Sequence, residues 1–199
     1  MKILFLDTAY FFIYIAIIDN NNLLFLHQEK NDQKLSERII ELIAEIFQKS
    51  NTSPNEITKI YVTNGPGSFT GIRVGVTIAK TTAFGLNIPI CSVSSLLMLA
   101  SGFSKPVATI IPDRNGYGFC AFYNQNVITK NEEYAKISEF LKENQYPVVS
   151  YEAIKNQKTI APIVDILRIV KKFKNQAENV HLVKANYIKK LDVEKTHKE

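Results

Sequence analysis

The chain has 199 residues, of which 46% are hydrophobic, and a formal net charge of +5. This length and composition allow a buried core in one domain or two small ones, without disulfide support. The longest apolar run, Ala9 to Ile18, is about half of the ~20 residues that a helix needs to cross a bilayer. Asp7 interrupts the apolar residues before it, which argues against a signal peptide. We therefore expect a cytoplasmic protein without a membrane span.

The excess positive charge lies at the C-terminal end. From Arg168 to Glu199 there are nine Lys or Arg residues and four acids, whereas the rest of the chain is balanced. Any attraction to phosphate would therefore come mainly from this end. A solvated tail is the simpler interpretation of the same pattern.

The cysteines and histidines do not form recognisable metal or redox motifs. Cys91 and Cys120 lie in apolar surroundings without CxxC spacing, which predicts buried, reduced thiols. The three histidines form no HxxxH or HExxH pair; they are His27, His181 and His197. We therefore expect no metal site and no cofactor in this chain.

The first half of the chain predicts the element order βββαβαβα. Apolar runs rich in β-branched and aromatic residues predict strands at residues 3–6, 11–18, 23–28, 57–63 and 88–93. Helical periodicity predicts helices at residues 32–49, with Asp32 as the N-cap, and at 72–86 and 95–100.

After Gly102 a shorter version of the pattern begins. Strands are expected at residues 107–112, 117–123, 127–129 and 148–151, and helices at 137–142 and 162–173, the last opened by Pro162. A strand, an aspartate turn and a second strand thus occur twice, at Asp7 and at Asp113. We predict an N-terminal domain over 1–102 and a smaller, degenerate copy with a basic end over 103–199. A duplicated βββαβαβα unit resembles the α/β fold of the actin, hexokinase and Hsp70 superfamily (ASKHA, RNase H-like).

A glycine-rich turn joins the fourth strand to the second helix. It reads Asn64-Gly65-Pro66-Gly67-Ser68-Phe69-Thr70-Gly71-Ile72-Arg73-Val74-Gly75. Its glycines permit backbone angles and close approaches that a Cβ would forbid, and Ser68 and Thr70 are candidate helix caps. The spacing is neither a dinucleotide fingerprint nor the phosphate loop of NTPases, and it contains no G-x-S-x-G elbow.

The string Gly-Pro-Gly-Ser-Phe-Thr-Gly-Ile-Arg resembles the signature of the TsaB (YeaZ) family, relatives of TsaD, the enzyme that makes threonylcarbamoyladenosine in tRNA. Further segments agree with that family: Ile3 to Ala9, Ser36 to Ile40, Ile111 to Arg114 and Ala185 to Lys189. Leu35 departs from it, because many members carry histidine there. The resemblance is strong through residue 123 and looser beyond.

The resemblance implies a partner subunit without catalytic residues. TsaD carries a Val-x-His-x-x-x-His metal motif, whose two histidine positions fall here on Ser95 and Leu99. Leucine cannot bind a metal and a lone hydroxyl is a poor ligand. The family implies a chain that binds and organises TsaD, with TsaE joining, for N6-threonylcarbamoylation of the adenosine next to the anticodon. tRNA would then be contacted indirectly, through the complex.

Two predicted helices have the composition of contact surfaces. Apolar residues of the first helix span an arc of ~200°, although one buried face needs only ~100° or a little more. The second helix has small residues at four-residue intervals, which would let another helix approach closely. The family is known to pair through these helices with TsaD or with itself. The candidate partner-binding residues are Ile39, Ile40, Ile43, Phe47, Gly75, Ala79 and Ala83.

The remaining candidate residues lie in turns that are either phosphate-loop-like or structural. They are Asp7, Thr8, Gly65, Gly67, Ser68, Thr70, Gly71, Arg73 and Asp113. We predict that the aspartate turns are mainly structural, because a carboxylate at a strand end can accept backbone N–H bonds. The alternatives are an autonomous metallopeptidase or small-molecule kinase of the same superfamily, or a nucleic-acid-binding module based on the basic C-terminal end.

Overall fold

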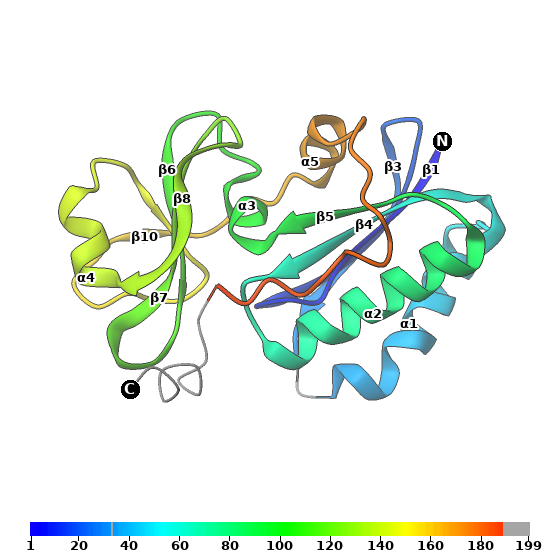
Figure 1. The fold of residues 1–199 in the computed structure, drawn as a ribbon, viewed down its shortest axis with the longest axis horizontal. Helices are drawn as coiled ribbons and strands as arrows, with labels where there is room; N and C mark the ends of the chain where they lie inside the picture. Colours follow the sequence, from blue (N-terminus) through cyan, green and yellow to red (C-terminus); the bar gives the residue numbers. More distant parts are fainter. Residues whose placement is uncertain (33, 189–199) are drawn as a thin grey trace.

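The computed structural model describes residues 1–32 and 34–188. The first half forms a mixed sheet in the order β3-β2-β1-β4-β5 (Figure 1). Its strands are β1 (Lys2–Asp7), β2 (Phe12–Asp19), β3 (Asn22–Lys30), β4 (Ile57–Gly65) and β5 (Ile90–Ser94). Its helices are α1 (Leu35–Lys49), the short η1 (Pro54–Glu56), α2 (Phe69–Leu86) and α3 (Ser95–Ala100). The predicted order βββαβαβα is confirmed.

The second half repeats this topology in a shorter form. Its strands are β6 (Val107–Pro112), β7 (Tyr117–Asn124), β8 (Val127–Lys136), β9 (Val148–Val149) and β10 (Thr159–Ile160), and its sheet order is β10-β9-β6-β7-β8. Its helical segments are η2 (Arg114–Gly116), α4 (Ile137–Phe140), η3 (Leu141–Glu143) and α5 (Ile166–Lys172). In both sheets the first three strands are antiparallel and the fourth pairs in parallel with the first. The predicted internal duplication is therefore confirmed.

Alternating side chains divide the core into layers. On β1, Ile3 and Phe5 join a cluster with α3, α5 and the second sheet, whereas Leu4 and Leu6 pack under α1 and α2. A third cluster lies between the second sheet and α4. Figure 1 shows the resulting arrangement, with α1 and α2 side by side on one face of the first sheet. The glycine-rich turn and the aspartate turn lie at one end of that sheet.

Several element boundaries differ from the predictions. Helix α1 begins at Leu35, and Asp32 instead accepts a hydrogen bond from the backbone of Lys34 at 3.0 Å. Helix α5 begins after Asp165, whose carboxylate caps it, so Pro162 lies outside the helix. Strand β8 is longer than predicted, and the two-residue β10 was not predicted.

The C-terminal segment 174–188 returns to the first half, which the predicted division at residue 102 does not anticipate. Glu178 pairs with the edge strand β5 through a backbone bond to Ile90 and a side-chain bond to Ser92, so this edge is covered. Val183 is buried in the cluster under α2. Figure 1 shows this segment running along the first half beside α2. The domain boundary itself remains a prediction.

A buried lysine ties α5 to the first sheet. Lys59 on β4 donates to the carbonyl oxygens of Phe173, Lys174 and Gln176, at 3.2, 2.9 and 2.5 Å. These carbonyls lie just past the end of α5, where a cation is favoured. Burial lowers the pKa of Lys59.

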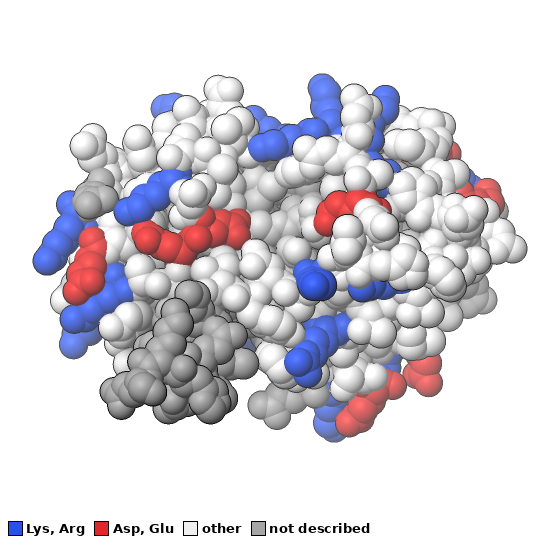
Figure 2. All heavy atoms as spheres, viewed as in Figure 1, with Lys and Arg blue, Asp and Glu red and all other residues white. Residues whose placement is uncertain are grey.

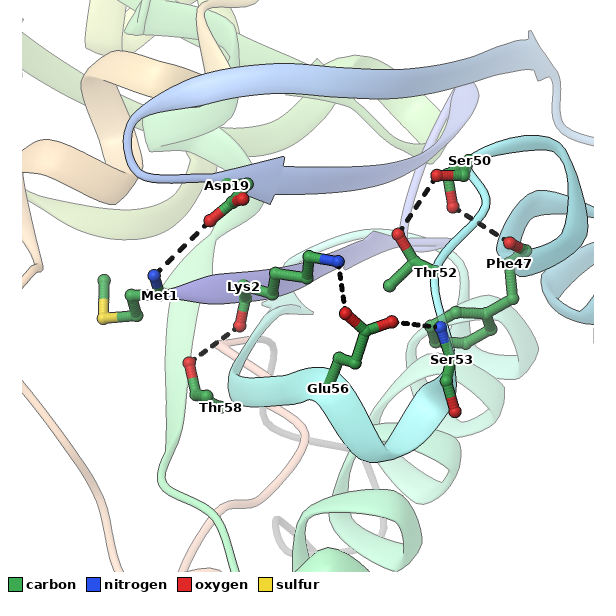
Figure 3. A network of polar contacts seen from close by, with 9 residues as sticks. All are labelled: Met1, Lys2, Asp19, Phe47, Ser50, Thr52, Ser53, Glu56 and Thr58. Atoms are coloured by element: carbon green, nitrogen blue, oxygen red, sulfur yellow. Dashed lines mark hydrogen bonds and ion pairs between the residues drawn. The ribbon is translucent and has the colours of Figure 1, made fainter.

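Polar side chains also fix the start of β1 (Figure 3). The Lys2 ammonium lies 2.5 Å from the Glu56 carboxylate, which also accepts the backbone N–H of Ser53 at 2.7 Å. The Thr58 hydroxyl donates to the Lys2 carbonyl at 2.9 Å. These bonds hold the connection between α1 and β4 against the sheet, at the end of β1 opposite to the aspartate turn.

The predicted burial of Cys91 and Cys120 is confirmed. Within the described ranges, no group of three or more metal-ligating side chains occurs. His197 lies outside the described residues. No helix of the described part of the chain is long and apolar enough to span a membrane.

Candidate functional site

The aspartate turn after β1 and the glycine-rich turn before α2 are packed directly together. The Thr8 hydroxyl donates to the Gly71 carbonyl at 2.7 Å, and the Ser68 N–H donates to the Ala9 carbonyl at 2.7 Å. A Cβ added at Gly71 would lie only 2.1 Å from the Thr8 carbonyl oxygen. Glycine is therefore required here by contact with the neighbouring backbone.

Other residues of the glycine-rich turn are also structural. Ser68 caps α2 as predicted, accepting the Gly71 N–H at 3.2 Å, whereas Thr70 is exposed in the first turn. Gly65 has a φ of +112°, and Gly67 also has a positive φ. The glycine-rich composition of this turn is therefore explained by its close packing against other parts of the same chain.

Asp7 is buried at the end of β1, with 4% of its surface exposed. Its Oδ1 accepts the Ala9 N–H at 2.9 Å and the Thr63 hydroxyl at 2.5 Å. The predicted backbone bond is thus present. Burial raises the pKa of Asp7 to about 6, and the two hydrogen bonds oppose this shift.

Aromatic rings fill the space beside Asp7. Tyr151, from the second half, stacks on Phe11 with ring centroids 5.0 Å apart and meets Phe12 edge-on at 5.1 Å. Its hydroxyl lies 2.7 Å from that of Tyr14. Tyr10 lies against Tyr151 as well, and its hydroxyl donates to a glutamate of the second half. The two halves therefore meet through these rings, which the sequence reading did not single out.

Ser95 and Leu99 line the same region and are almost fully buried. With Asp7 and the rings they enclose a cavity of only about 10 Å³. One water needs roughly that much space. The positions that the resemblance aligns with the TsaD histidines are thus brought next to Asp7, in a space too small for a nucleotide.

The raised pKa of Asp7 predicts a pH-dependent stability. Its folded-state pKa of about 6 exceeds the ordinary 3.8, so the folded state binds the proton more tightly and the free energy of unfolding falls as pH rises from about 4 to about 6. This shift corresponds to about 3 kcal/mol. Asparagine stays neutral and can accept the same two bonds. We expect Asp7→Asn to match the wild type near pH 4 and to exceed its stability at pH 7.

Urea unfolding between pH 4 and pH 7 tests this expectation. Asp32→Asn, which changes an exposed carboxyl, is the matched control and should keep the wild-type pH dependence. An Asp7→Asn variant that is less stable than the wild type at pH 7 would contradict the account.

Asp113 occupies the corresponding turn of the second half. Its N–H donates to the Tyr117 carbonyl at 2.8 Å, and its carboxylate accepts the Tyr134 hydroxyl at 2.8 Å. A pocket of about 730 Å³ opens beside it, lined in part by Lys136 and Lys142. Asp113 thus also has structural bonds in its turn.

The structure corrects most of the predicted partner-binding residues. Five of the seven are buried in the monomer: Ile39, Phe47, Gly75, Ala79 and Ala83. The small residues of α2 face the first sheet, and a Cβ at Gly75 would lie 2.3 Å from the Thr8 hydroxyl. They permit close packing of α2 on its own sheet, so they are not a surface for another helix. Only Ile40 and Ile43 keep accessible side chains.

The outward surface of α1 and α2 is instead formed by other residues, which we call the outer face. On α2 an exposed threonine stripe lies opposite the buried side; it comprises Thr70, Thr77 and Thr81. Half-buried Val74 and Ile78 flank it, and on α1 Ile40 is 64% exposed. Helix α2 contains no acidic residue. The signal in the sequence was therefore the low charge of α2, which contains no acidic residue and only two basic ones, Arg73 and Lys80.

Arg73 also lies on the outside of α2, away from the aspartate turn. Its guanidinium stacks over the Phe69 ring at 3.8 Å, and its Nε donates to the Tyr187 hydroxyl at 3.0 Å. The prediction that grouped Arg73 with the turn residues is wrong, because Arg73 lies within α2 and its side chain is exposed on the surface of that helix. A cavity of about 350 Å³ lies between the starts of α1 and α2, lined in part by Leu35, Ser68 and Thr70.

Comparison with known proteins agrees with this architecture. A family model described as "TsaD: tRNA N6-adenosine threonylcarbamoyltransferase" matches residues 27–190. The chain is 33% identical over 159 residues to the tRNA threonylcarbamoyladenosine biosynthesis protein TsaB of Bacillus subtilis (strain 168), covering 75% of this chain and 69% of the relative. It is 35% identical over 140 residues to the protein of the same name from Escherichia coli (strain K12), covering 67% and 60% respectively.

A solved structure, YeaZ from Pseudomonas aeruginosa, shares the fold with a TM-score of 0.76 at 18% identity, covering 94% of this chain and 99% of that one. The fold and the family match define an α/β protein of the ASKHA type, in the family that the TsaD model describes. More narrowly, the chain belongs to the TsaB family.

Proposed function

We propose that the chain is a non-catalytic subunit that binds and organises a TsaD protein, with TsaE joining, for N6-threonylcarbamoylation of the adenosine next to the anticodon in tRNA. The names of its relatives place them in threonylcarbamoyladenosine biosynthesis. Membership of the same family supports the same pathway for this chain.

The observation that carries the proposal is the composition of the outer face, whose defining residues are threonines and apolar side chains. Exposed helix surfaces normally carry charge, whereas the centres of protein interfaces are depleted of it. Here the outward residues of α2 are mainly threonines flanked by apolar side chains, with Arg73 at one edge, and α1 adds the exposed Ile40. Figure 2 shows white surface over α2 together with blue Lys or Arg side chains beside it. This composition fits a surface that a partner protein covers.

The region beside Asp7 supports a non-catalytic role. A kinase or peptidase needs an open site next to its catalytic groups. In this chain the rings of Phe11, Phe12 and Tyr151 fill that region, and Ser95 and Leu99 replace the histidines that the resemblance to TsaD would require. The fold is thus retained, and Asp7 stabilises the turn after β1 through its hydrogen bonds to Ala9 and Thr63.

Calorimetric titration of the purified chain with TsaD from the same cell tests the proposal. We expect a stoichiometric complex to which TsaE can be added. In the absence of TsaD, a second copy of the chain can cover the outer face, so we also expect a self-association that TsaD reverses. A chain that binds neither TsaD nor itself would contradict the proposal.

A further inference from the structure

Three side chains at the edge of the outer face form one rigid group, which we call the Arg73 cluster: Phe69, Arg73 and Tyr187. The guanidinium lies 3.8 Å from the centre of the Phe69 ring, and the Phe69 and Tyr187 rings are 5.3 Å apart. The Tyr187 hydroxyl accepts the Nε–H of Arg73 at 3.0 Å. Stacking and this hydrogen bond together fix the plane of the guanidinium.

The backbone that carries Tyr187 is itself held in place. The Asn186 N–H donates to the Asn64 carbonyl at 2.7 Å, and the Asn64 side chain donates to the Lys184 carbonyl at 3.2 Å. Val183, just before them, is buried under α2. The C-terminal segment thus delivers Tyr187 to α2 in a defined position. An arginine that is ordered in advance loses less entropy when it binds.

The cluster is exposed, and no described residue matches its charge. Phe69 and Tyr187 are 49% and 43% exposed. Arg73 has no acidic side chain within 4.0 Å in the described part of the chain, and its Nε is its one hydrogen-bonded nitrogen there. The other cation of α2 is Lys80, whose ammonium donates hydrogen bonds to the carbonyls of His181 and Val183. Within residues 1–32 and 34–188, the two terminal nitrogens of Arg73 therefore have no hydrogen-bond partner.

We propose that the Arg73 cluster receives a carboxylate side chain of the protein that covers the outer face, and so fixes the position of that partner on α2. This inference rests on the proposed function and names the chemistry of the contact. Tyrosine, phenylalanine and arginine are enriched in the contacts that dominate protein interfaces, and a guanidinium can bind a carboxylate through two parallel bonds. RNA fits less well, because a phosphate-binding surface presents several cations, whereas α2 has only one cation that is not bonded to carbonyls of the described residues.

Two variants test the contact in titrations with TsaD from the same cell. Arg73→Lys keeps the charge and loses the planar fork, and we expect it to weaken binding about 10- to 100-fold. Tyr187→Phe keeps the ring but removes the hydroxyl that orients Arg73, and we expect a loss of about 3- to 10-fold. Arg114→Lys, the same change at an exposed arginine of the second half, is the matched control and should leave affinity unchanged. Thermal melting should show that all three variants fold.

The salt dependence gives a second measurement. Between about 0.05 and 0.5 M salt, the wild type should lose more affinity for TsaD than an Arg73→Met variant does, because the variant lacks the ion pair. Arg73 variants that bind TsaD as tightly as the wild type would overturn the cluster and leave the proposed function standing. A wild-type chain that does not bind TsaD would overturn both. If Arg73 variants bound TsaD with unchanged affinity but the assembled complex retained tRNA less well, the cluster would be an RNA contact. This result would overturn the proposal that it binds a carboxylate of the partner.

Discussion

Gly71→Ala is expected to destabilise the monomer by about 3 kcal/mol, at the upper end of the usual cost of overpacking. The added Cβ would lie 2.1 Å from the Thr8 carbonyl oxygen, and this atom belongs to the backbone, so the two turns must separate. Separation would also break the bond from the Thr8 hydroxyl to the Gly71 carbonyl. Urea unfolding at a single pH measures the change.

The same helix offers a matched control. Gly85 has no atom within 4 Å of an added Cβ, and its φ is not positive. Gly85→Ala should therefore stabilise the chain by up to about 1 kcal/mol through helix propensity. The two glycine-to-alanine changes are thus expected to act in opposite directions. If both had the same small effect, the close packing of the glycine-rich turn on the aspartate turn would be wrong.

Ile40→Glu is expected to weaken binding to TsaD by more than 100-fold, because an unpaired charge buried in an interface costs about 3–5 kcal/mol. Ile40 is 64% exposed in the monomer, so the same change should leave the melting temperature of the isolated chain nearly unaltered. Titration with TsaD and thermal melting of the variant measure the two effects.

Val127→Glu is the matched control, since Val127 is similarly exposed but lies on the hairpin of the second sheet. It should bind TsaD like the wild type. Equal affinities of the Ile40 variant and the wild type would exclude this part of α1 from the interface, whereas equal losses for both variants would indicate a non-specific effect of charge.

The element order was predictable because alternating and continuous apolar runs report directly on a buried sheet. Ile3 to Leu6 and Val107 to Pro112 could be matched as equivalent strands on their sequence alone. Helix starts were less predictable: Asp32 and Pro162 are of types common near helix starts, yet α1 begins after Lys34 without a side-chain cap and α5 is capped by Asp165. Such choices depend on which backbone groups the tertiary structure leaves unpaired.

The site was harder to predict because it also depends on tertiary contacts. Small residues spaced by four suit a contact with another helix and a contact with the chain's own sheet equally well, and only the position of Thr8 shows that Gly75 faces the sheet. The hydrogen bond between the hydroxyls of Tyr14 and Tyr151 joins residues 137 positions apart. No local pattern could pair them. The Arg73 cluster likewise depends on the return of the C-terminal segment to α2.

We propose that this chain acts by binding TsaD and has no catalytic role of its own. Formation of threonylcarbamoyladenosine on tRNA, reconstituted from purified components with each one omitted in turn, tests this claim most directly. We expect modification to be lost when the chain is omitted and no product to form from the chain without TsaD. We also expect that Ile40→Glu fails to restore modification at concentrations at which the wild-type chain restores it. Full modification in the absence of the chain, or product formed by the chain in the absence of TsaD, would contradict it.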